Sequence, residues 1–206
     1  MTAASCSFYD RVNIDNVIAA YERNNYKLCT DGDYNLNLFG IRSSDMTSDK
    51  FNDLVGVLYR NKNIWVLHRY GATTDPGLYY RENPMNVNGT AILAPGQYPG
   101  AFKIGYHQGK YKALVQNKPL LLYRDANRNG VLEYIGEPSW EMAGINLHRA
   151  NASVTSKVVQ RWSGGCTVIA DPEDFSELLS ICEESKSIYG DGFTFTLFTE
   201  EQFFGE

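Results

Sequence analysis

The chain contains the run LVGVLY at residues 54–59 and the run IWVLHRY at residues 64–70, with two asparagines in the tetrapeptide between them. Short runs of β-branched and aromatic residues bounded by turn-forming residues are typical of β-strands. The same pattern holds from Tyr34 to Ala170, where Gly, Pro, Asn and Asp separate the runs. The other strands predicted in this region are residues 34–41, 101–106, 111–116, 120–124, 143–148 and 167–170.

A helix is predicted on each side of this region, because apolar residues recur there at i, i+3, i+4 and i+7. They are Ile14, Val17, Ile18 and Tyr21 in a helix over residues 13–24, and Phe175, Leu178, Leu179 and Cys182 in a helix that ends at Gly190. Asp171 and Pro172 suit the N-cap and first position of the second helix. The alternating run FTFTLF at residues 193–198 predicts a last strand. The predicted fold is mainly β, with about eight to ten strands, an N-terminal α-helix and a C-terminal α-helix.

The length of 206 residues predicts a single domain over residues 1–206. This domain consists of an N-terminal helical segment (1–30), a β core with the candidate site (34–170), and a C-terminal helix with the last strand (171–206). The composition, 43% hydrophobic and 21% charged, is ordinary for a globular protein.

The charge and hydrophobicity of the chain argue against two kinds of partner, nucleic acid and the interior of a membrane. The net charge is -5 and the basic residues are scattered, so no nucleic-acid surface is expected. No apolar stretch approaches the roughly 20 residues of a membrane span, so no membrane insertion is expected. Residues 1–9 lack the features of a secretory signal peptide. We therefore expect synthesis in a cytoplasm and, for any action outside it, another exit route.

The four cysteines, Cys6, Cys29, Cys166 and Cys182, have neither a disulfide-framework nor a zinc-site spacing and are predicted to be free thiols. Cys166 follows two glycines, which allow a sharp turn and leave backbone N–H groups accessible to an oxyanion. The alternative is an ordinary turn in which Cys166 is a small buried residue.

His148 ends the predicted strand 143–148, and 14 residues separate it from Ser163. A histidine at a strand end can lie at the rim of a sheet, where it can take a proton from a thiol. Cys182 is predicted on an apolar helix face, so it is a poor rival to Cys166. Cys29 precedes a turn and is a weak rival.

The motif Gly144-Ile145-x-x-His148, a gap, and then Ser163-x-Gly165-Cys166 resembles the signature of the L,D-transpeptidase (YkuD) family. The segment GQYPGAFKI at residues 96–104 resembles the stretch before the active-site strands of that family. The resemblance covers somewhat under half of the chain. It implies a β-sandwich-like YkuD-type fold and substrates among the peptide stems of bacterial peptidoglycan.

Carried over to this chain, the resemblance implies that Cys166 is the nucleophile and His148 its base. Ser163 would support the loop, and the N–H groups of Gly165 and Cys166 would form the oxyanion hole. The chain departs from the family pattern at Gly164, where histidine is usual, at Arg149 after the base, and at Val168. These departures bear on transpeptidation and on the choice of acyl acceptor.

Other runs along the chain, at residues 34–37, 40–42, 73–77 and 83–86, resemble proteins of phages and prophages of gut bacteria. The predicted function is therefore cysteine-dependent acyl transfer on peptidoglycan stem peptides, with hydrolysis by a phage endolysin as one form. In this setting the protein is released from the host cytoplasm to the cell wall, or is part of the virion. The alternative is a non-catalytic, virion-associated or wall-binding phage protein. NlpC-type and CHAP-type peptidases are disfavoured because they place cysteine before histidine.

Further residues are candidates for binding. His107, Arg149 and Trp162 are candidate substrate-binding residues, since an arginine can pair with stem-peptide carboxylates. His68 is expected to be structural. Acyl transfer by this pair requires no cofactor.

The segment DANRNGVLE at residues 125–133 resembles the opening of an EF-hand calcium loop. Asp125, Asn127, Asn129 and Glu133 stand at relative positions 1, 3, 5 and 9, with glycine at position 6. Position 12 is Gly136 in place of glutamate. The segment is thus a candidate Ca²⁺ site or, alternatively, an Asx-rich turn.

Overall fold

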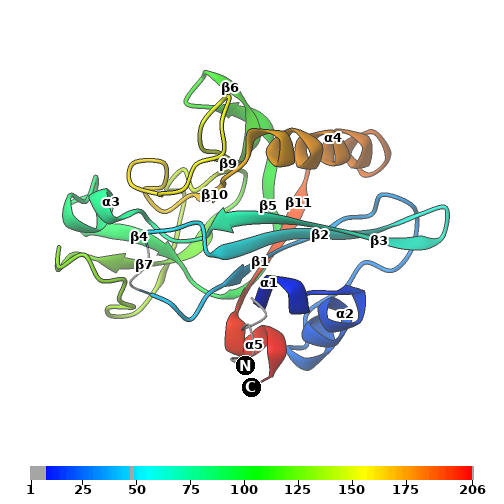
Figure 1. Ribbon diagram of the computed structural model, residues 1–206, viewed down its shortest axis with the longest axis horizontal. Helices are drawn as coiled ribbons and strands as arrows, with labels where there is room; N and C mark the ends of the chain where they lie inside the picture. Colours follow the sequence, from blue (N-terminus) through cyan, green and yellow to red (C-terminus); the bar gives the residue numbers. More distant parts are fainter. Residues whose placement is uncertain (1–7, 47–48, 206) are drawn as a thin grey trace, which may run out of the picture.

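The computed structural model describes residues 8–46 and 49–205. The described residues form a mainly β fold with helices towards both ends (Figure 1). The strands are β1 (Asn37–Arg42), β2 (Asp53–Asn61), β3 (Ile64–Thr73), β4 (Thr90–Leu93), β5 (Gly96–His107), β6 (Tyr111–Gln116), β7 (Leu120–Asp125), β8 (Ser139–Glu141), β9 (Leu147–Arg149), β10 (Thr167–Ile169) and β11 (Phe193–Thr199). The helices are α1 (Phe8–Arg11), α2 (Ile14–Arg23), α3 (Leu78–Glu82), α4 (Pro172–Tyr189) and α5 (Glu200–Phe204).

Eight of the described strands close into a barrel in the order β1-β11-β5-β6-β9-β10-β3-β2. Two neighbouring pairs are parallel, β1 with β11 and β9 with β10, and the other pairs are antiparallel. A separate three-stranded sheet, β4-β7-β8, lies beside the barrel on the side of α3 (Figure 1). The parallel pair β9–β10 matters most here, because it carries His148 and the start of the strand that follows Cys166.

Both predicted helices are confirmed, the second with its predicted N-cap at Asp171 and its end before Gly190. The Asn13 side chain accepts a hydrogen bond from the N–H of Asn16 at the start of α2, and Asp171 accepts from the N–H of Glu173 at the start of α4. Gly190 follows α4 with a φ of 86°, which glycine adopts without the strain of a side chain. The local sequence alone therefore determines where these helices begin and end.

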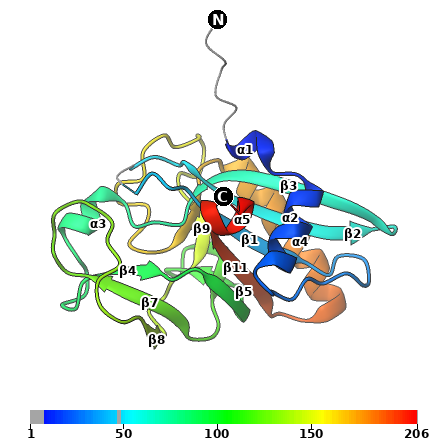
Figure 2. The same cartoon turned by 90° about the horizontal axis from the view of Figure 1, so that it is seen from below.

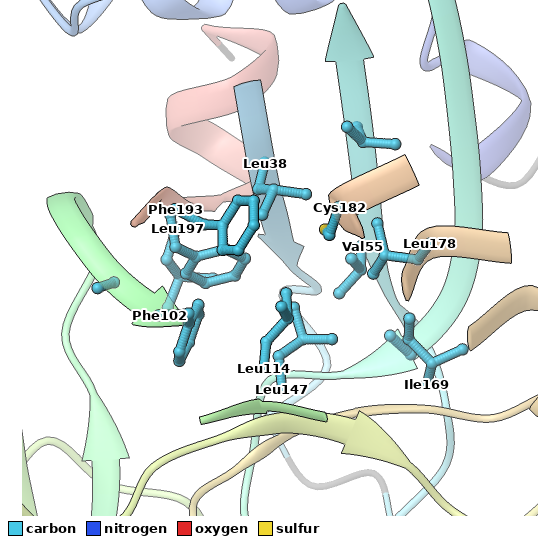
Figure 3. Packing of buried hydrophobic residues seen from close by; sticks show 14 of the residues in the cluster. Leu38, Val55, Phe102, Leu114, Leu147, Ile169, Leu178, Cys182, Phe193 and Leu197 are labelled. Atoms are coloured by element: carbon cyan, nitrogen blue, oxygen red, sulfur yellow. The ribbon is translucent and has the colours of Figure 1, made fainter. Parts of the chain in front are cut away.

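The barrel interior is filled by apolar side chains from strands on all sides and from α4 (Figure 3). Phe102 and Phe195 pack with their ring centroids 5.4 Å apart, and Leu178 and Cys182 of α4 lie in the same cluster. A second cluster on the outer face of β1 and β2 includes Val17 and Tyr21 of α2 and Phe203 of α5. Figures 1 and 2 show that α4 and the pair α2 and α5 cover different sides of the barrel.

The structure departs from the predicted elements in several places. The strand predicted over residues 143–148 is reduced to Leu147–Arg149, because Gly144 has a φ of 74° and interrupts extended backbone. The short strands β4 and β8 and the helices α1, α3 and α5 were not predicted, since segments of three to five residues contain too little periodicity. The described helices include none with the length and apolarity that crossing a bilayer requires.

Candidate active site

Cys166 directly precedes β10, and His148 is the central residue of β9. In the parallel register Thr167 pairs with Leu147 and Val168 pairs with His148. Because side chains alternate across a strand, Cys166 and His148 are directed to the same face of this pair. Both line a cavity of about 180 Å³. Its other lining residues include Tyr80, Met85, His107, Asn146, Arg161 and Trp162.

The turn before Cys166 is held by Ser163. The hydroxyl of Ser163 donates to the carbonyl of Cys166 at 2.7 Å and accepts the N–H of Gly165 at 3.2 Å. The carbonyl of Ser163 accepts the N–H of Gly77 at 2.8 Å, which ties the turn to the segment after β3. Ser163 is fully buried. It therefore has the supporting position that the sequence motif predicted.

The backbone of Gly165 admits no other residue without strain. Its φ is 120°, and a Cβ built there would lie 2.6 Å from the carbonyl oxygen of Ala91. The N–H of Gly165 is occupied by Ser163, whereas the N–H of Cys166 has no hydrogen-bond partner among residues 8–46 and 49–205. Of the two N–H groups expected at an oxyanion hole, the one on Cys166 is thus available without rearrangement.

Gly164 fits closely under two side chains. A Cβ at Gly164 would lie 2.5 Å from Cε of Met85 and 3.5 Å from the ring of Tyr80. Met85 therefore occupies the space next to the position where the family pattern has histidine. Since the contact is with the flexible end of a methionine, a side chain at Gly164 would require only that Met85 move aside.

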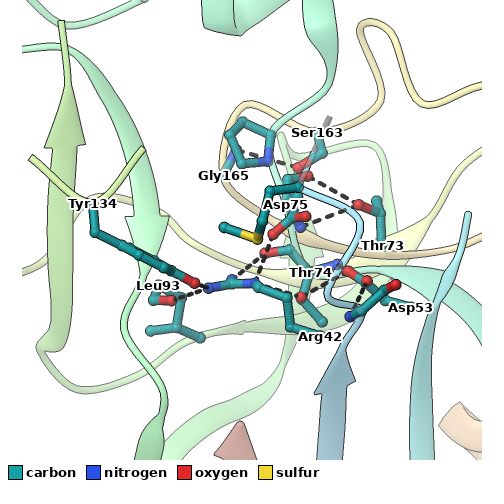
Figure 4. A network of polar contacts seen from close by, with 12 residues as sticks. Arg42, Asp53, Thr73, Thr74, Asp75, Leu93, Tyr134, Ser163 and Gly165 are labelled. Atoms are coloured by element: carbon teal, nitrogen blue, oxygen red, sulfur yellow. Dashed lines mark hydrogen bonds and ion pairs between the residues drawn. The ribbon is translucent and has the colours of Figure 1, made fainter. Parts of the chain in front are cut away.

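A buried polar network lies behind this turn (Figure 4). Arg42 forms an ion pair with Asp75 at 2.6 Å and donates to the carbonyl of Leu93 at 2.8 Å. Asp53 accepts the N–H of Thr74 at 2.6 Å, and its burial raises the pKa of that carboxyl to about 7. The network fixes residues 74–75, immediately before the Gly77 that holds the Ser163 carbonyl.

The ring of His148 is oriented by its Nδ1 atom. Nδ1 lies 2.7 Å from the carbonyl oxygen of Arg149 and 3.1 Å from the hydroxyl of Tyr111. A carbonyl oxygen only accepts hydrogen bonds, so Nδ1 carries the proton and Nε2 keeps a free lone pair. The hydroxyl of Tyr111 also donates to the Arg149 carbonyl at 3.2 Å. His148 is thus held in the tautomer that a general base requires.

His107 packs directly on His148. The rings of His107 and His148 are stacked with centroids 3.9 Å apart, and the Asn146 amide lies 3.0 Å from Nδ1 of His107. The backbone N–H of Asn146 also lies 3.4 Å from Sγ of Cys166. Asn146 therefore contacts both the thiol and the second histidine, and it connects the two halves of the site.

Burial keeps both members of the pair neutral. It raises the pKa of the Cys166 thiol to about 11, against a smaller opposing effect of the Asn146 N–H. Burial, followed by the neighbouring His107, lowers the pKa of His148 to about 3. At neutral pH the site therefore contains an uncharged imidazole and a thiol, whose Sγ lies 3.6 Å from the carbonyl oxygen of Gly144.

The remaining predicted binding residues are divided between the cavity and its surroundings. Trp162, which is 41% exposed, and His107 line the cavity. Arg149 instead lies with its guanidinium 4.1 Å from the ring centroid of Tyr111, outside the cavity lining. Arg161 lines the cavity and packs over Tyr79 at 3.8 Å. Neither arginine is paired with a carboxylate in these contacts.

Two residues that orient the pair were not predicted. Asn146 precedes His148 by two positions, so the alternation of side chains along the strand was a usable signal. Tyr111 is opposite His107 in the β5–β6 pairing, which only the three-dimensional structure reveals.

The other cysteines lie elsewhere. Cys182 is fully buried in α4, and Cys29 lines a different cavity whose described lining contains no histidine. Cys6 lies outside the described residues. His68 contacts Glu177 at 3.1 Å and the hydroxyl of Tyr59 at 3.4 Å, away from the Cys166 cavity.

No family model, curated protein or solved structure matches this chain. The functional inference below therefore depends on the geometry of the Cys166 cavity and on the motifs in the sequence.

Proposed function

We propose that the protein carries out cysteine-dependent acyl transfer on peptide bonds of peptidoglycan stems, in the manner of L,D-transpeptidases and L,D-peptidases. The observation that carries the proposal is that Cys166, directly before β10, and His148, on the adjacent parallel strand β9, line one cavity, with the histidine proton fixed on Nδ1. This combination supplies a nucleophile, a base and an orienting group.

The chemistry assigns one task to each group. Sγ of Cys166 attacks the carbonyl carbon of the scissile bond while Nε2 of His148 takes the thiol proton. The N–H of Cys166 donates to the oxyanion of the tetrahedral intermediate. His148 then returns the proton to the leaving amine, and a thioester forms on Cys166. Water or a second amine attacks the thioester with Nε2 again as base, which releases the product and restores the thiol.

An adjoining cavity supports a substrate longer than one residue. It has a volume of about 270 Å³ and shares Tyr80, Met85 and Gly164 with the Cys166 cavity. Its far side carries the ion pair of Arg124 with Glu141. Two connected cavities suit an extended peptide with charged groups, such as a peptidoglycan stem.

We further propose that the barrel is a variant of the β-sandwich-like YkuD assembly. The setting would be a phage protein released to the wall of its bacterial host, or carried by the virion. The sequence motifs at residues 96–104, 144–148 and 163–166 support the first statement, and the runs at residues 34–37, 40–42, 73–77 and 83–86 support the second.

The test is the turnover of purified muropeptides, followed by mass spectrometry. Wild-type protein and Cys182→Ala should give the same cleaved or exchanged stem peptides, and Cys166→Ala should give none. Equal product from Cys166→Ala would overturn the proposal. Binding of peptidoglycan without turnover by the wild type would favour the non-catalytic wall-binding alternative.

A further inference from the structure

A second candidate site lies in the loop after β7, in the three-stranded sheet beside the barrel. The side-chain amides of Asn127 and Asn129 both donate to Oε2 of Glu133, the second at 3.0 Å. Asp125, at the start of the loop, directs its carboxylate towards the same loop, because its Oδ1 accepts the N–H of Asn127 at 3.2 Å. The two amides thus reach Glu133 through their N–H groups, and Asp125, Asn127, Asn129 and Glu133 lie in one turn of nine residues.

The buried carboxylate of Asp125 is the decisive feature. Asp125 is only 2% exposed, and its Oδ2 is buried without a hydrogen-bond partner among the described residues. A buried carboxylate oxygen that meets neither a donor nor a cation is rare in folded proteins. This oxygen therefore has the environment of a ligand atom whose partner is a cation.

The backbone of the loop turns around the same point. Arg128 and Gly130 have φ values of 60° and 78°, and the buried Leu132 anchors the end of the turn in the protein. The amide oxygens of Asn127 and Asn129 each accept one backbone N–H, at 3.1 and 2.8 Å. An amide oxygen has two lone pairs, so each keeps one for a cation.

We propose that residues 125–133 form a Ca²⁺ site, with ligands from Asp125 Oδ2, the side-chain oxygens of Asn127 and Asn129, and Glu133. The donor set consists of oxygens alone, which suits a hard cation. Two carboxylates balance its charge, and a mixture of amide and carboxylate oxygens suits the flexible coordination of Ca²⁺ better than the rigid octahedron of Mg²⁺. Among the described residues no three His, Cys, Asp or Glu side chains gather as a metal site, so the amide oxygens are essential.

The site would stabilise the region behind the Cys166 turn. Tyr134 follows the loop and its hydroxyl accepts from Arg42 at 2.9 Å, within the buried network of Figure 4. Arg81 of α3 lies 3.5 Å from the carbonyl of Gly130. Ca²⁺ binding should therefore raise the melting temperature of the whole protein, since a ligand that binds only the native state shifts unfolding.

The experiment is calorimetric titration of the EDTA-treated, dialysed full-length protein with CaCl2 or MgCl2, together with thermal unfolding. Glu133→Gln is the test variant, since Glu133 is exposed and the change preserves its shape; Glu137→Gln, outside the loop, is the matched control. We expect one Ca²⁺ site with a Kd on the order of 10⁻⁴ M, a rise in melting temperature of several degrees at saturation, and weaker binding of Mg²⁺. Glu133→Gln should weaken Ca²⁺ binding at least tenfold, and Glu137→Gln should not change it.

A second variant, Asp125→Asn, tests the ligand role of the buried carboxylate. It should abolish the response to Ca²⁺ and raise the melting temperature of the metal-free protein, because it removes a buried charge whose Oδ2 has no hydrogen-bond partner among the described residues. The absence of heat and of a thermal shift in the wild type up to 10-fold above the expected Kd would overturn the proposal. So would a Glu133→Gln variant that binds as well as the wild type. None of these outcomes depends on turnover at Cys166.

Discussion

Cys166 and Cys182 are both free thiols whose pKa is raised by burial, yet their surroundings differ in kind. Cys182 is fully buried in the core beside Leu178, whereas Cys166 is partly exposed and lines a cavity with His148. The acidity of the isolated thiol therefore does not distinguish a nucleophile from a packing residue in this fold. In the proposed function, access to the cavity and the neighbouring His148 distinguish Cys166 from Cys182.

The largest expected difference between the two cysteines is in turnover. Cys166→Ala and His148→Ala should each lower kcat on stem peptides by at least about 10³-fold and to a similar degree, because groups that act as a unit are not additive. Cys182→Ala should retain activity. Circular dichroism of each variant provides the folding control. Full activity in His148→Ala would contradict a base role for that residue.

The pH dependence of alkylation should separate the thiols next. Because the pKa of Cys166 is about 11, its thiolate fraction should rise about tenfold per pH unit between pH 7 and pH 10. Peptide mapping after a short exposure to iodoacetamide should show this rise at Cys166 and almost no labelling at Cys182. A plateau below pH 8 would mean that a thiolate–imidazolium pair already exists at rest, against the neutral pair described above.

The two glycines before Cys166 allow a comparison at the level of the backbone. Gly165→Ala should lower the free energy of unfolding by about 1–3 kcal/mol, because of its positive φ and the close carbonyl of Ala91. Gly164→Ala should cost less than about 1 kcal/mol, since only the end of Met85 has to move. Urea unfolding measures both values. Equal costs would mean that Gly165 is not conformationally required.

The smallest effect concerns Cys182 as a packing residue. Cys182→Ala should lower the free energy of unfolding by about 1 kcal/mol, the cost of removing one buried atom of about the size of a methylene from the core. Chemical denaturation measures this change. A stability equal to the wild type's, together with reduced turnover, would reverse the roles assigned to the two thiols.

The sequence predicted those features of the fold and of the candidate site that depend on residues close together in the chain. Periodicity located α2 and α4, with a predicted N-cap for α4, and runs of β-branched and aromatic residues between turn-forming residues located most strands of the barrel. The motif around Ser163 and Cys166 indicated the turn that Ser163 holds. By contrast, the stack of His107 on His148 and the contact of Tyr111 with Nδ1 join residues 37–41 positions apart. The pairing of β5 with β6 and of β6 with β9 brings them together, and no local pattern encodes the pairing of β6 with β9.

The closure of the barrel itself shows the same limit. Strand β11, near the C-terminal end, pairs in parallel with β1, and β5 pairs on its other side. Each strand has a clear apolar pattern, but these patterns are compatible with many pairings. The sequence therefore predicted the strands and not their order.

The central claim, that Cys166 is the nucleophile of an acyl transfer, is tested most directly by locating the covalent intermediate. The protein is mixed with purified peptidoglycan stem peptides, quenched in acid during turnover, digested, and mapped by mass spectrometry. The account predicts an acyl group, bound as a thioester, on the peptide that contains Cys166 and on no other cysteine peptide. Turnover with the acyl group on a different residue, or turnover that persists in Cys166→Ser without an adduct, would contradict it.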